Sequence, residues 1–460
     1  MRAIPTSVRF QINDRLIQKL FDSAEAKLKE NVKDFGGRPV LIEGGGYHKI
    51  WLETQPMGGE MYAKRNITAA INNQLLFMEH QRDDGRIPGS IMVENGKLIP
   101  QFNKFQGFCF PSPALNMYYW MGQDKEYLQL LRQSLERFDA YLWRIRDADH
   151  DGLLESWCVY DTGEDNALRY GDAPCWWEDD VPPEGFEVVP MASMDFMSFS
   201  YSARDTLAKI STILNDGKQA FWRNEAEEVK QKIKAHLWHE ERGACFDRDK
   251  NGRRMNTLTH NNLRCMYWGS FTVDMARRFV SEHLLNPEEF WTHMPLPSVA
   301  ANDPLFRNVP TNDWSGQPEG LTYQRAIRAL ENYGYHKLIP VLGHKLFEGI
   351  GEDCIFTQQF DPFTKKRSGD TDGYGPTMLA VLEYISRLYG IHMEGEEVHW
   401  GITGGRDCVY TQVWGDTTYT LQCDGRHATA LVNGRKVFTS DIGVKITTDC
   451  NGNIINTVPV

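Results

Sequence analysis

The sequence lacks the cysteine patterns of a disulfide framework and of a structural zinc site. Its nine cysteines are scattered from Cys109 to Cys450, and none forms a Cys-x-x-Cys pair. Disulfide scaffolds use an even number of cysteines at ordered spacings, and zinc sites use closely spaced pairs. We therefore expect reduced, mostly buried thiols and no metal ligands among them.

Long apolar runs and an excess of positive charge are also missing. No apolar stretch reaches the length of a membrane span, and the first ten residues contain no apolar signal segment. The chain has 50 Lys and Arg against 62 Asp and Glu, for a net charge of −12. An acidic chain is poorly suited to bind nucleic acid or an anionic bilayer. The sequence predicts a soluble, cytoplasmic protein without nucleic-acid or membrane partners.

Aromatic residues are plentiful, at 12% of 460 residues. A chain of this length can bury a large core, and most of these rings are expected to fill it. A smaller share could line a pocket, and aromatic walls suit a carbohydrate ligand.

Helical spacing of apolar residues dominates the first 390 residues. No segment repeats at a fixed period, which disfavours a solenoid. The polar and aromatic residues gather in loops between the predicted helices, as expected for an α/α barrel or another helical assembly. The predicted helices cover about 11–31, 62–81, 113–121, 125–146, 193–214, 217–238, 272–284, 319–333, 335–349 and 378–390.

The period changes to two near residue 395. Val409, Thr411 and Val413 alternate, and Asn433-Gly434 is a strong signal for a two-residue hairpin. We expect a mainly α domain over residues 1–395, nearly free of strands, and a small β domain over 396–460. A packing or lid role for the β domain is favoured over a sugar-binding module.

Asp147, Asp149, Asp151 and Gly152 have the spacing of the first half of an EF-hand loop. The twelfth position of that loop would be Cys158, where calcium needs a bidentate Glu. A glycine turn whose acids accept backbone N–H groups is the favoured alternative to a calcium site.

The loop at 161–170 concentrates acids, an amide, an arginine and aromatics between two predicted helices. Glycoside hydrolysis usually takes two carboxyl groups, and the proton donor needs a pKa raised by an apolar setting. Asp165 lies near Trp157, Tyr170 and Trp177 in sequence, so it is a candidate donor. A structural capping role is the alternative for a loop Asp.

Several motifs give the chain a resemblance to a known family. They are residues 151–157 (Asp-Gly-Leu-Leu-Glu-Ser-Trp), 163–170 (Gly-Glu-Asp-Asn-Ala-Leu-Arg-Tyr), 296–304, 314–318, 358–364 and 374–377. In this order they resemble the six-hairpin glycosidases of glycoside hydrolase family 63 and their mannosylglycerate and glucosylglycerate hydrolase relatives, and more distantly the trehalases.

The resemblance implies an (α/α)6 barrel and an inverting, exo-acting glycosidase for small α-linked glucosides or mannosides, with no organic cofactor. It makes Asp165 the general acid. The candidate substrate-binding residues are Trp157, Asn166, Arg169, Tyr170, Trp177, Trp314, Gln317, Tyr374 and Glu60.

One departure from the family pattern concerns the general base. The family has a Glu four residues before the proline of the 358–364 motif, and this chain has Gln358 there. Glutamine cannot take a proton from water. Glu319 stands where the family usually has Trp and is a candidate replacement, although an acid in a first helical turn also has a local explanation. Weaker candidates are Glu60, Asp313 and Asp372.

Two other functions remain open at this point. A chain without its base could be a catalytically inactive carbohydrate-binding protein. An inverting disaccharide phosphorylase needs no base, because phosphate is already anionic, and the basic run 365–367 follows Gln358 closely.

Overall fold

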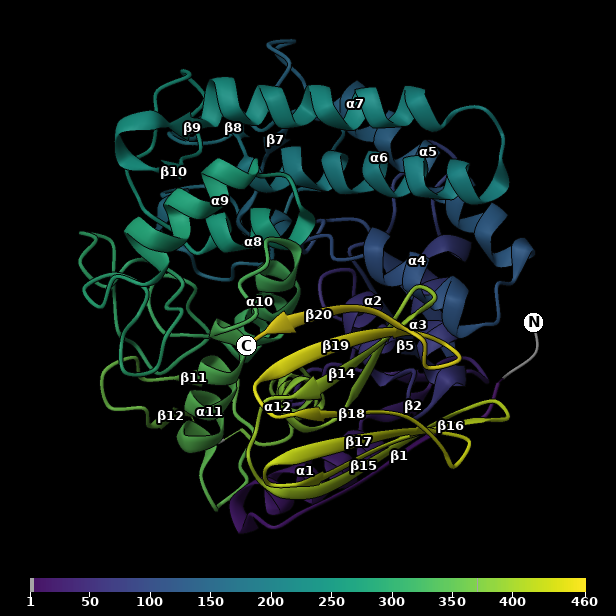
Figure 1. Ribbon diagram of the computed structural model, residues 1–460. Helices are drawn as coiled ribbons and strands as arrows, with labels where there is room; N and C mark the ends of the chain where they lie inside the picture. Colours follow the sequence, from purple (N-terminus) through teal and green to yellow (C-terminus); the bar gives the residue numbers. More distant parts are fainter. Residues whose placement is uncertain (1–3, 370) are drawn as a thin grey trace.

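The computed structural model describes residues 4–369 and 371–460. Helices fill most of the molecule, and long strands from the C-terminal part of the chain lie together on one side (Figure 1). The described residues form the α-helices α1 (Arg15–Glu30), α2 (Gln55–Tyr62), α3 (Ile67–Glu79), α4 (Pro111–Trp120), α5 (Lys125–Ile145), α6 (Met194–Leu214), α7 (Gln219–Lys232), α8 (Asn261–Trp268), α9 (Val273–Phe279), α10 (Gly320–Asn332), α11 (Leu338–Ile350) and α12 (Gly375–Tyr389).

The even-numbered helices are packed against one another in a closed order. Each contacts the next, from α2 through α4, α6, α8 and α10 to α12, and α12 contacts α2 again. All or nearly all residues of α2, α4, α8 and α12 are buried, which is expected of an inner layer. This helix-rich arrangement with a C-terminal β region agrees with the fold of an (α/α)6 glycosidase.

The outer helices follow the amphipathic stripes of the sequence. In α1, for example, the buried residues are Ile17, Leu20, Phe21, Ala24 and Leu28, as the spacing predicts. Asp14 and Asp124 begin α1 and α5 by accepting the backbone N–H of Ile17 and Tyr127. The predicted helix at 62–81 differs from the structure, where α2 ends at Tyr62 and Asn66 caps the separate helix α3.

Two antiparallel sheets make up the β region. One has the order β1-β15-β16-β17-β18 and the other β13-β14-β19-β20. Trp400 on β14 lies 5.5 Å from Phe438 on β18, so the sheets pack face to face. The strands are β1 (Thr6–Ile12), β13 (Ile391–Glu394), β14 (Glu397–Ile402), β15 (Asp407–Trp414), β16 (Thr417–Asp424), β17 (His427–Val432), β18 (Arg435–Asp441), β19 (Val444–Asp449) and β20 (Ile454–Pro459).

The β region includes more of the chain than residues 396–460. β13 begins at Ile391, and β1 comes from the N-terminus to pair with β15 from Thr6↔Trp414 to Ile12↔Cys408. The hairpin at Asn433-Gly434 is confirmed, with positive φ at both residues between β17 and β18.

The loops of the helical part contain short strands that the sequence did not predict, because two to five residues carry little periodic signal. They are β2 (Val32–Asp34), β3 (Pro39–Leu41), β4 (Ile50–Trp51), β5 (Ser90–Glu94), β6 (Lys97–Gln101), β7 (Glu155–Ser156), β8 (Met191–Ala192), β9 (Trp238–His239), β10 (Ala244–Cys245), β11 (Gln359–Phe360) and β12 (Arg367–Ser368).

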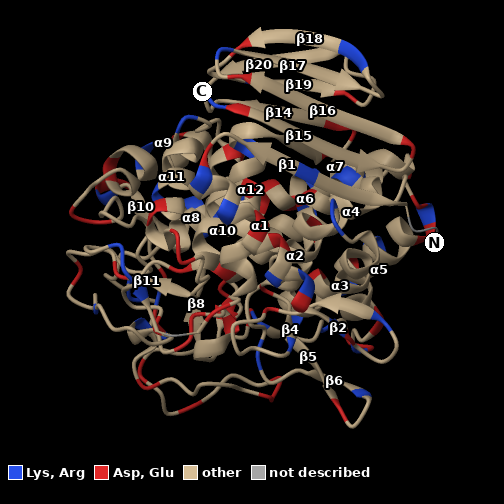
Figure 2. Cartoon of the chain, turned by 90° about the horizontal axis from the view of Figure 1, so that it is seen from below, with Lys and Arg blue, Asp and Glu red and all other residues tan. Residues whose placement is uncertain are grey.

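The large sheets and the short loop strands lie toward opposite ends of the molecule. Figure 2 has the strands of the two large sheets at one end, and β4, β8 and β11 toward the other. Across the described residues, no helix combines the length and apolar character that a membrane crossing requires.

Candidate active site

Asp165 lies in a loop between two short 3-10 turns, Val159–Asp161 and Leu168–Tyr170. Its Oδ2 accepts a hydrogen bond from Nδ2 of Asn312 at 2.8 Å, and its Oδ1 is buried without a hydrogen-bond partner among the described residues. Burial raises the pKa of Asp165 above its ordinary value, although the amides of Asn312 and Gln106 and the ammonium of Lys104 oppose the shift.

A second segment holds the Asp165 loop in place. The backbone N–H of Trp314 donates to the Asp165 carbonyl at 3.1 Å, and Nδ2 of Asn166 donates to the Asn312 carbonyl at 2.6 Å. The backbone N–H of Leu168 donates to Oγ of Ser315 at 2.7 Å. The candidate acid and the residues 312–315 therefore form one locally rigid unit.

Gln358 faces the same space as Asp165. Its Nε2 donates to Oδ1 of Asn312 at 3.0 Å, and its Oε1 accepts from the hydroxyl of Tyr47 at 2.9 Å. Asn312 thus bridges the acid and the position where the family has its base. The structure brings Asp165 and Gln358 together through Asn312.

Glu319 is fully buried beside Gln358. The backbone N–H of Gly320 donates to the Gln358 carbonyl at 2.8 Å, and neither carboxylate oxygen of Glu319 has a hydrogen-bond partner among the described residues. Burial raises the pKa of Glu319 well above its ordinary value, and the charges of Asp165 and Glu53 add to the shift, while the amides of Gln359 and Gln358 oppose it. Glu319 is the N-cap residue of α10, but its side chain makes no capping hydrogen bond, so the local explanation rests on the helix dipole alone.

Two further buried acids line the site and were not predicted. The hydroxyl of Tyr374 donates to Oε1 of Glu43 at 3.0 Å, and burial raises the pKa of Glu43 well above its ordinary value. Glu53 pairs with Arg325, and burial raises its pKa to about 7 against the effect of the arginines. Glu53 lies in a predicted loop that mixes acids and aromatics, and this composition could have marked it as a candidate site residue. Glu43 adjoins a glycine run that gives no such signal.

Three predicted sugar-binding residues, Arg169, Tyr170 and Trp157, instead support the Asp165 loop through contacts within the protein. Arg169 forms ion pairs with Glu164 and Asp247 and is buried. The hydroxyl of Tyr170 lies 2.8 Å from Oγ of Ser156 and 2.9 Å from Oγ1 of Thr162. These contacts use the polar atoms that a sugar would need.

Trp157 is similarly engaged. Its indole N–H donates to Glu155 at 2.7 Å, and the guanidinium of Arg146 lies 4.0 Å from its ring centre. We correct the roles of Trp157, Arg169 and Tyr170 from sugar contact to support of the Asp165 loop.

The remaining predicted residues fall into two groups. Tyr374 and Trp314 belong to the site, since they contact Glu43 and Asn312. Gln317 donates to Asn308 at 2.6 Å, and Trp177 donates to the Val181 carbonyl, so both lie in the surrounding loops.

The weaker candidates for a base lie elsewhere. Glu60 is buried further along α2, where it accepts from Asn116. Asp313 is paired with Arg307, and Asp372 with Lys27. None of the three contacts Asp165 or Gln358.

The contacts of the basic run 365–367 give no support to a phosphorylase. Lys365 pairs with Glu348 at 2.9 Å, and Arg367 pairs with Asp353 at 3.1 Å. Because these cations have carboxylate partners on the surface, nothing in their contacts favours a phosphate subsite.

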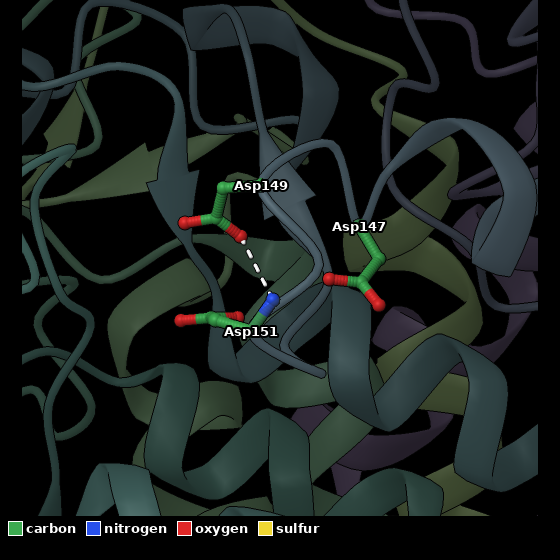
Figure 3. A group of neighbouring side chains, drawn as sticks. All are labelled: Asp147, Asp149 and Asp151. Atoms are coloured by element: carbon green, nitrogen blue, oxygen red, sulfur yellow. Dashed lines mark hydrogen bonds between the residues drawn. The ribbon is translucent and has the colours of Figure 1, made fainter.

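Asp147, Asp149 and Asp151 form a turn on the surface (Figure 3). One oxygen from each lies within 4.8 Å of the others, and the three carboxylates accept the backbone N–H groups of Gly152, Asp151 and Leu153. This is the capped turn expected as the alternative to calcium binding, and we assign no ion to it.

The fold has several solved relatives of low sequence identity. The GH63 mannosylglycerate hydrolase of Thermus thermophilus, in complex with glucose, matches with a TM-score of 0.64 and 16% identity over 80% of this chain and 100% of that one. The same hydrolase has also been solved with Tris and D-glycerate.

Two other structures extend this comparison. The neutral trehalase of Saccharomyces cerevisiae matches with a TM-score of 0.56 and 14% identity over 76% of this chain and 73% of that one. A sialidase matches with a TM-score of 0.72 and 14% identity over 95% of this chain and 41% of that one.

The sequence itself carries the family assignment. No match was found among the curated proteins. The family model of the mannosylglycerate hydrolase MGH1-like glycoside hydrolase domain matches residues 58–376, which is more than half of the chain. The chain therefore belongs to the MGH1-like glycoside hydrolase family and is a glycosidase.

Proposed function

We propose that this glycosidase is an inverting, exo-acting hydrolase of small α-linked glucosides or mannosides, with Asp165 as general acid and Glu319 as general base. The observation that carries the proposal is the position of Glu319. It supplies a buried carboxyl without a hydrogen-bond partner among the described residues, directly beside Gln358, where the family has its base. The site thus retains two carboxyl groups although position 358 has changed.

The distance between Asp165 and Gln358 has an upper bound that is compatible with inversion. Two hydrogen bonds and one amide group separate Oδ2 of Asp165 from Nε2 of Gln358, so these atoms are at most about 8 Å apart. Inverting enzymes hold their two carboxyl groups roughly 6.5–9.5 Å apart, which leaves room for the attacking water. Glu319 lies beside Gln358, and the charge of Asp165 acts on its pKa.

The reaction follows from these positions. Water gives a proton to Glu319 and attacks the anomeric carbon, the bond from that carbon to the aglycone oxygen breaks, and the oxygen takes the proton of Asp165. Burial raises the pKa of both carboxyls, and the charge of Asp165 adds to the shift of Glu319. Activity requires the proton on Asp165 and a charged Glu319, which gives a bell-shaped pH profile.

Two lysines over the ring of Trp51, of which Lys104 also acts on the pKa of Asp165, favour an anionic aglycone. The ammonium of Lys104 lies 5.7 Å from the ring centre of Trp51 and 5.9 Å from that of Tyr160, and that of Lys49 lies 5.2 Å from Trp51. Their hydrogen bonds go to the neutral side chains of Asn103 and Gln101. Burial lowers the pKa of both lysines, since no carboxylate among the described residues pairs with them.

The acid must face the leaving group, so these cations lie on the aglycone side. A carboxylate there would neutralise them. The relative from Thermus thermophilus, which was solved with D-glycerate, supports a small hydroxy acid as the aglycone of this chain too.

The finer description of the fold is part of the same proposal. The closed order of the even-numbered helices supports a complete (α/α)6 barrel over residues 1–395. The β domain at 396–460, extended by β1 and β13, packs on α12 and α1 at the end away from the site, which favours a packing role. A cytoplasmic location stays a prediction.

Turnover tests the function directly. We expect the purified chain to release sugar from α-glucosides or α-mannosides of small hydroxy acids, and proton NMR to detect the inverted anomer first. Asp165→Asn and Glu319→Gln should each reduce kcat by at least about a thousandfold, because each removes one of two required proton transfers.

The control for these variants is Asp179→Asn, which changes an exposed acid in the neighbouring loop and should leave kcat unchanged. Full activity of Glu319→Gln would contradict the assignment of the base. Binding of sugars by calorimetry without release of sugar, with or without phosphate, would favour an inactive binding protein.

A further inference from the structure

Asn312 lies between the proposed acid and Gln358, and nothing in its sequence context marks it. We infer that Asn312 and Gln358 form a positioning relay that places the transferable proton on Oδ1 of Asp165, so that the amide at position 358 is a working part of the site and not a lost base. This inference rests on the proposed function of Asp165 as general acid.

The orientation of the Asn312 amide is fixed by a group that can only donate. The indole N–H of Trp314 lies 3.2 Å from one end of this amide. Because an indole N–H has no acceptor capacity, that end must be the carbonyl oxygen Oδ1. The other end is then the NH2 group, and it points at Oδ2 of Asp165.

The hydrogen bonds of Gln358 run in the same direction, from Tyr47 toward Asp165. Its NH2 group donates to Oδ1 of Asn312, and its own carbonyl oxygen accepts from Tyr47. Burial raises the pKa of Tyr47 far above its ordinary value, so its hydroxyl keeps the proton that it donates. Every hydrogen bond from Tyr47 to Asp165 thus has a donor facing an acceptor.

The relay decides which oxygen of Asp165 can carry a proton. Oδ2 receives an N–H from Asn312, so a proton on Oδ2 would face another donor. The proton therefore belongs on Oδ1, which is buried and makes no hydrogen bond among the described residues, while the Gln106 amide also acts on this carboxyl. An acid proton on a free oxygen is available to the leaving group without breaking an existing hydrogen bond.

A glutamate at position 358 would not fit this arrangement. A carboxylate there would place acceptor against acceptor at Oδ1 of Asn312, and the buried repulsion would rotate the amide or force the carboxyl to take up a proton. Glutamine satisfies both neighbours. The change at position 358 and the presence of Glu319 beside it are therefore consistent with each other, since Glu319 can act as the base while Gln358 orients the acid.

Other charged and titratable groups also act on Asp165. They face it from several loops and stay the same in the variants below. They are Lys104, Glu43, Glu53, Glu319, Tyr47 and Tyr160.

The experiment measures the pKa of Asp165 in the full chain by carboxyl carbon NMR with labelled aspartate, where the signal is assigned by its loss in Asp165→Asn. Asn312→Ala removes an N–H that favours the charged carboxylate, so the pKa should rise by about one unit. Trp314→Phe, which frees the amide to rotate, should shift it in the same direction. Asn302→Ala, an exposed asparagine on the same segment, should leave it unchanged.

Turnover supplies the second readout. Gln358→Glu should lower kcat/KM by about tenfold or more and move the alkaline limb of the pH profile, which mere support of the loop would not do. Higher turnover in Gln358→Glu, or an unchanged Asp165 pKa in both Asn312→Ala and Trp314→Phe, would overturn the relay. If the wild-type chain releases no sugar, the proposed function fails, and the NMR titration still decides the relay.

Discussion

Replacing the single residue Lys104 tests which aglycone the site prefers. Lys104 is a buried cation against two aromatic rings, on the side of Asp165 that we propose for the aglycone, without a carboxylate partner among the described residues. Lys104→Met should raise KM about tenfold for a substrate with a carboxylate aglycone, the effect of losing one charge-assisted hydrogen bond. A substrate of the same sugar with a neutral aglycone should keep its KM.

The control is Lys97→Met, which removes an exposed lysine from β6 and should affect neither substrate. Initial rates over a range of ionic strength give the second check, because a buried pair is screened less than surface charge. Equal losses on both substrates would assign Lys104 to the stability of the loop instead.

The sequence could locate the site, but it could not show which residues bind sugar and which support the loop. Asp165 and Gln358 were expected to face one pocket, and in the structure both side chains hydrogen-bond to Asn312. Arg169 was expected to bind sugar, yet it is used in ion pairs beneath the loop, and a sequence cannot tell which partner an arginine faces. Asn312 and Glu43 were missed because an isolated amide or acid in a loop gives no pattern.

At the scale of elements, the N-termini of inner helices carry the site. Glu319 precedes α10 and Tyr374 precedes α12, and these two helix starts lie very close together. A Cβ on Gly320 would lie 1.8 Å from Oγ1 and 3.1 Å from Cα of Thr377. The approach of the two helices therefore requires glycine at this position.

Gly320→Ala should push α10 away from α12 and displace Glu319. Because a displacement of about 1 Å in a catalytic group can cost about a hundredfold, we expect a loss of that size in kcat/KM with the secondary structure retained. Gly349→Ala on α11 is the matched control, since its Cβ would meet the flexible end of Met294 at 3.1 Å and the Lys365 carbonyl only at the ordinary contact distance of 3.7 Å. Steady-state kinetics and circular dichroism separate the two outcomes, and unchanged kinetics in Gly320→Ala would contradict the argument.

The elements that the sequence predicted well are those with two unlike faces. Amphipathic stripes located α1 and α5 to within a few residues, and the alternation after residue 395 located the sheets. Helices α2 and α8 were missed because eight residues buried on every side show no periodic contrast. Strand β1 was not predicted, because its partner lies about four hundred residues away in the chain.

At the scale of the whole molecule, one residue joins the two parts of the fold. Phe10 on β1 lies 5.1 Å from Phe21 of α1, 6.3 Å from Tyr389 of α12 and 5.8 Å from Tyr410 of β15. A helix of each layer and the five-stranded sheet thus meet at one buried ring. This arrangement predicts that the helical and β regions unfold together.

Phe10→Ala should lower the free energy of unfolding by about 3–5 kcal/mol, the usual cost of truncating a buried Phe. Because Phe10 belongs to both regions, urea titrations followed by circular dichroism and by tryptophan fluorescence should shift by the same amount and keep one transition. Phe221→Ala, at a ring that is 53% exposed, should change the midpoint little. Two separate transitions, with only the one that reports on the sheets displaced, would mean that the β region folds independently of the helices that hold the site.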